Sequence, residues 1–176
     1  SDVYKRQTLL STPLCIDPKG NEGLNPQKTE PTNPLYSLDK QQSSLVYYDK
    51  NTIVLTMPYW VKVTNSSVED SEVKKHSFVL SYDPEAMTAS DTKLKLYISH
   101  VVEDAGETVT RSNFTYAYRA YSIRAALAAF KEKTGKLPKY LELTAEINNS
   151  KDELVDKDGK ETSVERSVEY DYAFTE

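Results

Sequence analysis

The feature that most constrains the fold of this chain is a regular alternation of side-chain types from Lys93 to Val102. Every second residue from Leu94 to Val102 is an aliphatic residue or a histidine, and most of the residues between them are polar. A period of two residues is typical of a β-strand that turns one face to a core and the other to water. The chain must therefore build at least one sheet that is covered on one side.

Similar patterns predict six further strands. They occupy residues 44–48, 52–64, 76–82, 113–121, 139–147 and 164–174. Pro58 lies inside the second of these stretches and predicts an edge position or a bulge, because proline cannot donate a hydrogen bond to a neighbouring strand. The same alternation predicts that Tyr59, Tyr116 and Tyr118 face inward.

The pattern changes to that of an α-helix after Ser122. Ile123, Leu127 and Phe130 recur at helical spacing, Ser122 can cap the start, and Gly135 can end the helix. Short strands with one crossover helix predict a mainly β fold, an immunoglobulin-like antiparallel β-sandwich with one α-helix near residues 122–134. We expect the apolar stripe of this helix to cover one open end or face of the core.

The first part of the chain is predicted to lie outside the sandwich. Ser1 to Gln7 is the in-frame translation of TCAGATGTGTATAAGAGACAG, which resembles the transposon end used to prepare sequencing libraries, so we interpret residues 1–7 as a sequencing artefact. Residues 17–36 hold four of the eight prolines. Residues 8–36 are therefore predicted to be a linker or the tail of a truncated N-terminal domain, and residues 37–176 the β-sandwich.

The charge balance argues against nucleic acid as a partner. The chain has 27 acidic and 22 basic residues, a formal net charge of -5. Affinity for nucleic acid depends on lysines and arginines that neutralise phosphates, which an acidic chain does not supply in excess. No apolar stretch is long enough for a membrane-spanning helix. The sequence therefore predicts neither a nucleic-acid partner nor a segment that inserts in a bilayer.

The two histidines suggest a structural pair. His76 and His100 both fall on the core side of their predicted strands, so they could approach each other at one end of the sheet. A zinc site needs three or four ligands, and no third ligand accompanies them at a recognisable spacing. The sequence thus predicts no metal and no cofactor.

A calcium loop is the alternative to a plain turn near Gly159. With Gly159 at the sixth position of an EF-hand loop, Asp156, Asp158 and Glu165 fall at the third, fifth and twelfth. The first position is Leu154, which has no carboxylate, and the flanks have a strand pattern instead of a helical one. We interpret this segment as a hairpin turn.

No catalytic constellation is recognisable. The chain has no nucleophile elbow, no Cys/His pair and no phosphate-binding glycine loop, and most of its acidic residues lie on the polar sides of strands or in loops. The sequence therefore predicts a protein that is not an enzyme. A carbohydrate-active enzyme, which needs two facing carboxylates, is the less favoured alternative.

Aromatic residues are the remaining candidates for recognition. The chain has thirteen tyrosines but four phenylalanines, and tyrosine suits both sheet faces and interfaces. Trp60 lies on the outward side of its strand unless a bulge at Pro58 turns it inward. We predict Tyr47, Tyr48 and Trp60 as the residues that bind an unknown protein or glycan partner. The alternative is that these rings only cover the edges of the core.

Three segments resemble a known family. The runs KKHSFVLSYDP (residues 74–84), LKLYISH (94–100) and YDY (170–172) are similar to the C-terminal β-sandwich of NigD-like lipoproteins of Bacteroidota. This resemblance implies a lipid-anchored protein of the cell envelope, in the periplasm or at the outer-membrane surface. It also implies that contact with a membrane occurs only through a lipid anchor upstream of this sequence. It implies no catalytic residues, and so a binding or accessory module of unknown ligand. A structural surface protein of adhesin or pilus type is the alternative.

Overall fold

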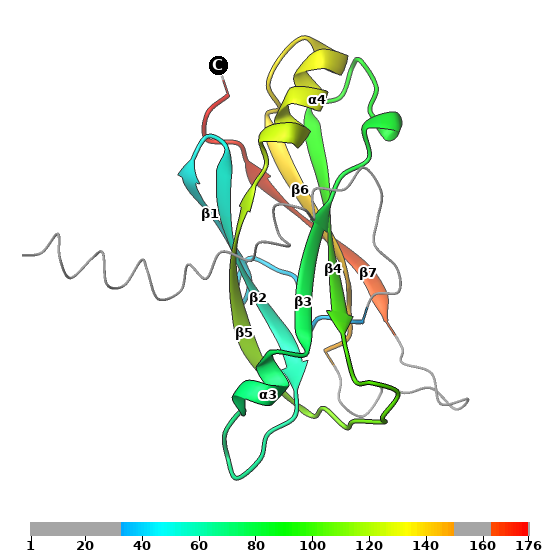
Figure 1. Cartoon of the computed structure of the whole chain (residues 1–176). Helices are drawn as coiled ribbons and strands as arrows, with labels where there is room; N and C mark the ends of the chain where they lie inside the picture. The colour runs from blue at the N-terminus through cyan, green and yellow to red at the C-terminus, as the bar shows by residue number, and fades with distance from the viewer. Residues whose placement is uncertain (1–32, 150–162, 176) are drawn as a thin grey trace, which may run out of the picture.

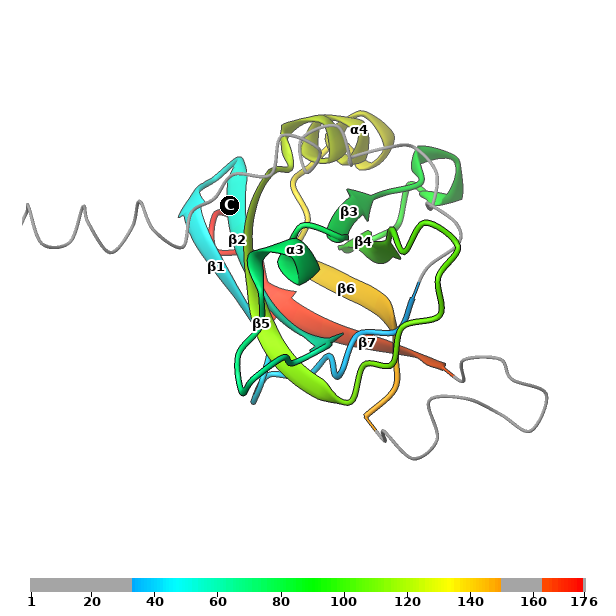
Figure 2. The same ribbon diagram turned by 60° about the horizontal axis from the view of Figure 1, so that its bottom comes forward.

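The computed structural model describes residues 33–149 and 163–175, which form two packed sheets (Figures 1 and 2). The first sheet has the strand order β1-β2-β5, with β1 at Ser44–Asp49, β2 at Thr52–Val61 and β5 at Asn113–Ser122. The second has the order β3-β4-β6-β7, with β3 at His76–Ser81, β4 at Lys93–Val102, β6 at Tyr140–Ile147 and β7 at Val164–Asp171. The predicted mainly β, sandwich-like fold is confirmed.

The prediction of a wholly antiparallel sandwich is wrong at one place. Strands β4 and β6 pair in parallel, with Lys93 opposite Tyr140. Between them the chain crosses to the first sheet through β5 and returns through the helix α4, Arg124–Thr134. It re-enters the second sheet at the end where β4 begins, and the amide of Lys139 donates to the carbonyl of Thr92 at 2.8 Å. A crossover of this length permits parallel pairing, which a hairpin cannot.

The core lies between the sheets and follows from the alternation in the sequence. On β2, each second residue from Ile53 to Val61 is buried against the opposite sheet, where the inward residues of β4 and β6 are leucines, isoleucine, histidine and alanine. Each fully buried aliphatic side chain contributes about 1.5 to 3 kcal/mol. The hydroxyl of Tyr121 donates to the carbonyl of Phe78 at 2.6 Å, so this buried tyrosine joins the two sheets.

The helix α4 covers one open end of the sandwich (Figure 2). Its buried residues are Ala126, Leu127 and Phe130, as the helical spacing predicts. It ends at Gly135, whose φ of 80° is left-handed and whose N–H donates to the carbonyl of Lys131. The predicted helix near residues 122–134 is confirmed, although it begins at Arg124. In the described ranges, no helix has the length and apolar character that crossing a membrane requires.

Pro58 occupies a regular strand position without a bulge. The pairing of β2 with β5 is continuous from Thr52 to Val61. The pairing of β1 with β2 ends at Thr56, so Pro58 lies beyond the end of β1 and is not required to donate a hydrogen bond to it. There the amide of Tyr36 donates to the Pro58 carbonyl at 3.0 Å. Of the two predicted alternatives, the structure therefore shows no bulge at Pro58, and the position resembles an edge although β2 is central.

The segment before β1 joins both sheets. Leu35 is fully buried and forms bridges to Tyr59 in the first sheet and to Ile147 in the second. Its N–H donates to the carbonyl of Glu146 at 2.9 Å, and its carbonyl accepts from Asn148 at 2.8 Å. The packed part of the described chain thus begins before the predicted boundary at residue 37. The predicted artefact at residues 1–7 and the turn at Gly159 lie outside the described residues.

Candidate functional site

One outer face of the sandwich is uncharged. Away from the β1–β2 turn, none of the outward side chains of the first sheet carries a charge, and we call this surface the aromatic face. Its members follow from the strand register and are Ser44 and Val46 on β1, Val54, Thr56, Pro58 and Trp60 on β2, and Phe114, Tyr116, Tyr118 and Ala120 on β5. In a chain with 28% charged residues, this composition is a departure from the ordinary surface.

The outer face of the second sheet has the opposite character. It carries Lys93, Lys95, Glu142, Glu146 and Glu169. The ammonium of Lys93 lies 2.7 Å from a carboxylate oxygen of Glu169 and 3.7 Å from one of Glu142. Such exposed pairs are typical of a solvated surface and contribute little to stability. The lack of charge is therefore particular to the first sheet.

The aromatic face exposes large rings in a row. Along β5, Phe114 is 39% exposed, Tyr116 38% and Tyr118 42%. Tyr36 stacks on Phe114 with ring centroids 4.0 Å apart and an interplanar angle of 13°. It also meets Trp60 edge-on at 5.1 Å. Contiguous exposed apolar surface of this kind marks interaction sites in soluble proteins.

The outward position of Tyr116 and Tyr118 corrects the sequence prediction. The inner side of β5 instead carries Asn113, Thr115, Ala117, Arg119 and Tyr121. The guanidinium carbon of Arg119 lies 5.2 Å from the ring centroid of Phe78. Alternation shows that a strand has two unlike sides, but not which side meets the core. Tyr59 does face inward and is 2% exposed, as predicted.

The structure does not bring the three predicted recognition residues together. Trp60 lies on the outward side, as predicted, but it is only 6% exposed, and its indole N–H donates to the carbonyl of Asn148 at 2.7 Å. Tyr48 is 66% exposed. Tyr47 is half-buried at the sheet edge, and its hydroxyl donates to the carbonyl of Asp171. Burial, with a smaller effect of Tyr172, raises the pKa of Tyr47 to about 12. Their role in recognition stays a prediction.

A hollow lies beside the indole of Trp60, and we call it the Trp60 hollow. Its volume is about 400 Å³, within the range of small-ligand sites. The residues that line it are Tyr36, Trp60, Ser112, Asn113, Phe114 and Asn149. None of them is charged. Sequence reasoning missed Tyr36 and Phe114, which the chain brings here from distant segments.

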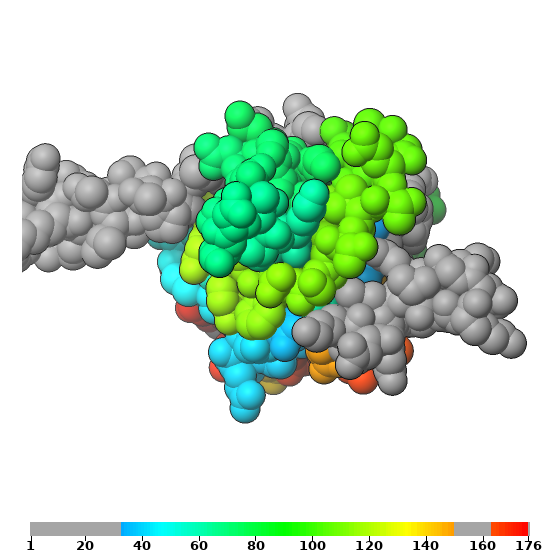
Figure 3. Space-filling view, turned by 90° about the horizontal axis from the view of Figure 1, so that it is seen from below, coloured from blue at the N-terminus to red at the C-terminus, as the bar shows by residue number. Residues whose placement is uncertain are grey.

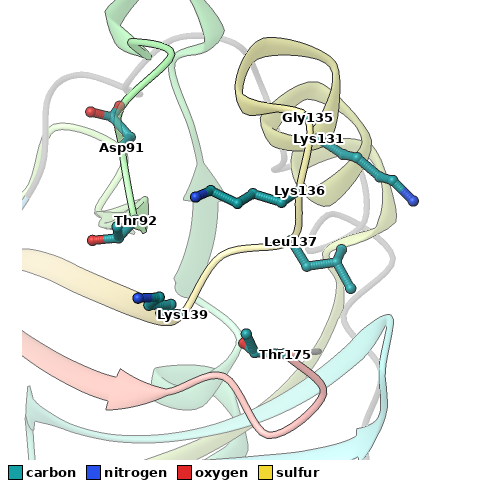
Figure 4. Close-up of a pocket in the computed structure, with 8 residues that line it drawn as sticks. All are labelled: Asp91, Thr92, Lys131, Gly135, Lys136, Leu137, Lys139 and Thr175. Atoms are coloured by element: carbon teal, nitrogen blue, oxygen red, sulfur yellow. The ribbon is translucent and has the colours of Figure 1, made fainter.

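A second hollow, of about 210 Å³, lies at the α4 end of the molecule (Figure 4). The residues that line it are Asp91, Thr92, Lys131, Gly135, Lys136, Leu137, Lys139 and Thr175. The side chain of Lys136 points toward Asp91 and Thr92, whereas that of Lys131 points away. This hollow has charged walls and no aromatic ring, so it differs in chemistry from the Trp60 hollow.

The predicted approach of the two histidines is confirmed. His76 Nδ1 lies 2.7 Å from His100 Nε2, and both rings are buried. His76 Nε2 lies 3.2 Å from a carboxylate oxygen of Glu72, which stands on the short helix α3, Asp70–Val73. Arg111 donates from Nε to Glu72 at 2.7 Å and forms a further bidentate pair with Asp104. These five side chains form what we call the buried ion network.

The protonation states of the network follow from its contacts. Burial alone would raise the pKa of Glu72, but hydrogen bonds from Arg111, the Lys62 amide and His76 lower it to about 2. Burial and the neighbouring His76 lower the pKa of His100 to about 3, and burial lowers that of His76. Ionised Glu72 can accept from His76 Nε2–H, and His76 Nδ1 can then accept from His100 Nε2–H. His100 Nδ1 also lies 3.3 Å from the carbonyl of Pro34, so a neutral His100, with one N–H, donates to only one of these two neighbours.

The buried ion network is a structural device of one end of the sandwich. It ties the loop that carries α3 to the segment between β4 and β5, and these segments lie side by side in Figure 3. The amide of Glu103 also donates to the carbonyl of Lys75 at 3.0 Å. Among the described residues, no three histidine, cysteine or acidic side chains are placed to hold a metal ion.

We expect the protein to lose stability as the pH falls below about 6.5. Between pH 6.5 and about 3, unfolded His100 binds a proton that folded His100 does not. The free energy of unfolding should therefore fall by up to about 1.4 kcal/mol per pH unit through this group. His76 acts in the same direction, and Glu72 adds a loss below its ordinary value of 4.5.

Urea unfolding at a series of pH values measures this dependence. The His100→Phe variant is the control, because a phenyl ring can stack on Phe78 as the imidazole does but cannot titrate. Its unfolding free energy should change less between about pH 6.5 and pH 4.5 than that of the wild type. Equal stability of the wild-type protein at these two values would contradict the assignment of a neutral, buried His100.

Comparison with known proteins finds solved structures to which this chain is similar. No protein-family model matches the chain, and no curated protein matches it significantly. It is similar to the crystal structure of a "putative lipoprotein" from Bacteroides fragilis NCTC 9343, with 25% identity over 86% of this chain and 69% of that one and a TM-score of 0.65. An uncharacterized protein from Parabacteroides merdae ATCC 43184 gives 14% identity, 82% and 64% coverage and a TM-score of 0.43. In its fold, this chain thus resembles the Bacteroides fragilis protein described as a "putative lipoprotein", for which no function is stated.

Proposed function

We propose that this chain is a non-catalytic binding or accessory module of the bacterial cell envelope, of NigD-like type. Two independent likenesses support this proposal. The runs at residues 74–84, 94–100 and 170–172 resemble NigD-like lipoproteins, and the fold resembles the Bacteroides fragilis lipoprotein. On this proposal, the full-length protein is held at the membrane by a lipid upstream of the sequence given.

The aromatic face is the observation that carries the proposal. Phe114, Tyr116 and Tyr118 keep a large apolar area in contact with water, at a cost of about 25 cal/mol for each Å² that a partner could cover. A sheet that served only to close the core would gain from polar residues here, as the second sheet has. We therefore assign ligand binding to this face.

The buried ion network supports a non-catalytic role. Glu72, His76 and His100 have lowered pKa values and are connected through His76, but each is buried. None of them lines either of the two hollows described above. A general acid or base must reach its substrate within hydrogen-bond distance. These groups instead use their hydrogen bonds to hold the fold.

Retention on isolated envelopes tests this function. The purified chain is incubated with washed envelopes of Bacteroides fragilis, and the bound fraction is measured after sedimentation. We expect the wild type to be retained and the Tyr116→Ser/Tyr118→Ser variant to lose most of its binding. The control is Lys95→Ser/Glu142→Ser, which alters the other outer face without a change in net charge and should bind as the wild type does.

Two outcomes would contradict the proposal. The first is a wild-type protein that remains in the supernatant. The second is equal retention of the variants on both faces. Light scattering of the purified protein at increasing concentration addresses the alternative, because polymerisation would favour a structural surface protein of adhesin or pilus type.

A further inference from the structure

We infer that the Trp60 hollow binds a neutral carbohydrate. This inference rests on the proposed function and names the ligand class of the same face. Three properties of the hollow carry it: aromatic side chains held in place, short polar side chains at its rim, and no charge among the described residues that line it.

The aromatic walls are fixed by their neighbours. The indole of Trp60 is anchored by its hydrogen bond to Asn148, and the ring of Tyr36 is held between Trp60 and Phe114. Tyr36 is fixed further by its backbone, because its amide donates to the carbonyl of Pro58. A pyranose ring presents flat apolar C–H faces, which bury favourably against aromatic planes. Walls that are already ordered lose little conformational freedom when a ligand binds.

The polar rim matches the hydroxyls of a sugar. Ser112, Asn113 and Asn149 line the hollow and supply a hydroxyl and two amides. Each of these groups can both donate and accept hydrogen bonds, as a sugar hydroxyl can. A purely apolar ligand would leave such groups without partners, and their desolvation would cost affinity.

The absence of charge selects against anionic and cationic ligands. Among the described residues, no lysine, arginine or acidic residue lines the hollow. Arg111 is next to Ser112 in the sequence, but its guanidinium is committed to Glu72 and Asp104. A phosphate or carboxylate would therefore meet no counter-charge, which recognition of such groups normally uses.

The shape favours a sugar over a folded protein partner. A standard protein interface buries roughly 800 Å² on each side over a broad surface. The Trp60 hollow is a local, shallow depression of about 400 Å³ at the edge of the aromatic face. Tyr116 continues the row of rings beyond Phe114, with centroids 5.9 Å apart, and could contact further units of the same chain.

Selective destruction of envelope components tests the ligand class. Envelopes of Bacteroides fragilis are treated with periodate, which cleaves the vicinal diols of sugars, or with proteinase K, which removes protein. We expect retention of the wild-type chain to be lost after periodate and kept after proteinase K. Loss after proteinase K alone, or after neither treatment, would overturn the carbohydrate inference and leave the proposed function standing. No retention on untreated envelopes would instead refute the proposed function.

Two variants test whether the ligand binds in the Trp60 hollow. Phe114→Ala removes one wall, and Asn113→Ala removes one rim amide from an exposed position, so at least the second should fold normally. Each is expected to weaken retention about tenfold, the effect of losing one good contact of about 1.4 kcal/mol. Lys95→Ala on the other sheet is the control. Wild-type retention by a folded Asn113→Ala and a folded Phe114→Ala would overturn this location.

Tryptophan fluorescence gives a direct readout of the same site. Trp60 is the only tryptophan in the chain, so all indole emission reports this hollow. Because Trp60 is buried, the emission of the free protein should be blue-shifted and protected from quenchers. Neutral polysaccharide released from the same envelopes should change this emission in a saturable way, whereas polygalacturonate should not. An unchanged emission at saturating neutral polysaccharide would contradict binding beside Trp60.

Discussion

Replacing Glu72 with alanine is expected to lower the free energy of unfolding by about 3 to 5 kcal/mol, the cost of removing one partner of a buried ion pair. The carboxylate of Glu72 accepts from Arg111, from the amide of Lys62 and from His76. Its loss leaves the amide and the imidazole without their acceptor. Arg111 retains its hydrogen bonds to Asp104. The loss of stability therefore comes more from the unpaired amide and imidazole than from the guanidinium. Urea unfolding near neutral pH measures the change.

Two variants control for the loss of charge and for the helix. Glu69→Ala alters an exposed acidic residue immediately before α3 and should change stability by less than about 0.5 kcal/mol. Glu72→Gln keeps the shape of the side chain, and we expect an intermediate loss because one carboxylate oxygen is replaced by a donor. A loss below about 1 kcal/mol for Glu72→Ala would show that the network does not hold this end of the sandwich.

Phe130→Ala is expected to cost about 3 to 5 kcal/mol, because it removes a large side chain from a packed site. Phe130 has no exposed surface, and it belongs to the core cluster together with Ile123 and Leu127 from the same segment. The cavity left behind cannot be filled without moving α4. Leu127→Ala, at 5% exposure, should cost about 2 to 5 kcal/mol. Thermal and chemical denaturation both measure these losses.

An exposed residue of the same helix supplies the control. Lys131→Ala lies one position after Phe130 on the solvent side and should leave stability within about 0.5 kcal/mol of the wild type. Denaturation of Phe130→Ala and Leu127→Ala that matched the wild type would show that the apolar stripe is a docking surface instead of a lid on the core.

The strands and the helix could be predicted because each has one periodic pattern and clear ends. The range of β4, Lys93–Val102, agrees with the sequence prediction residue for residue, and Gly135 ends α4 as expected. The parallel pairing of β4 with β6 could not be predicted, because alternation carries no information on strand direction. It depends on where the crossover through β5 and α4 returns the chain.

The candidate site was less predictable, and for a physical reason. Tyr36 follows a proline-rich segment, and only the tertiary fold places it against Trp60 and Phe114. Glu72 lies in a stretch of charged residues, and such a composition predicts a solvent-exposed segment. Its one local signal is the spacing of four residues to His76, which a single turn of helix can use. Arg111 reaches Glu72 from a distant loop that also carries Asp104 and shows no periodic pattern.

The bridges of Leu35 to both sheets have a mechanical consequence. A force applied to the chain at Asn33 is transmitted to β4 through the backbone hydrogen bond from Asn33 to His100. It is transmitted to the second sheet also through the bonds of Leu35 with Glu146 and Asn148, and to β2 through the bond from Tyr36 to Pro58. The applied force is thus shared between the two sheets before any one strand can separate from its neighbours. A tether attached upstream would therefore strain the whole sandwich as one body, and rupture would require several backbone hydrogen bonds to break together.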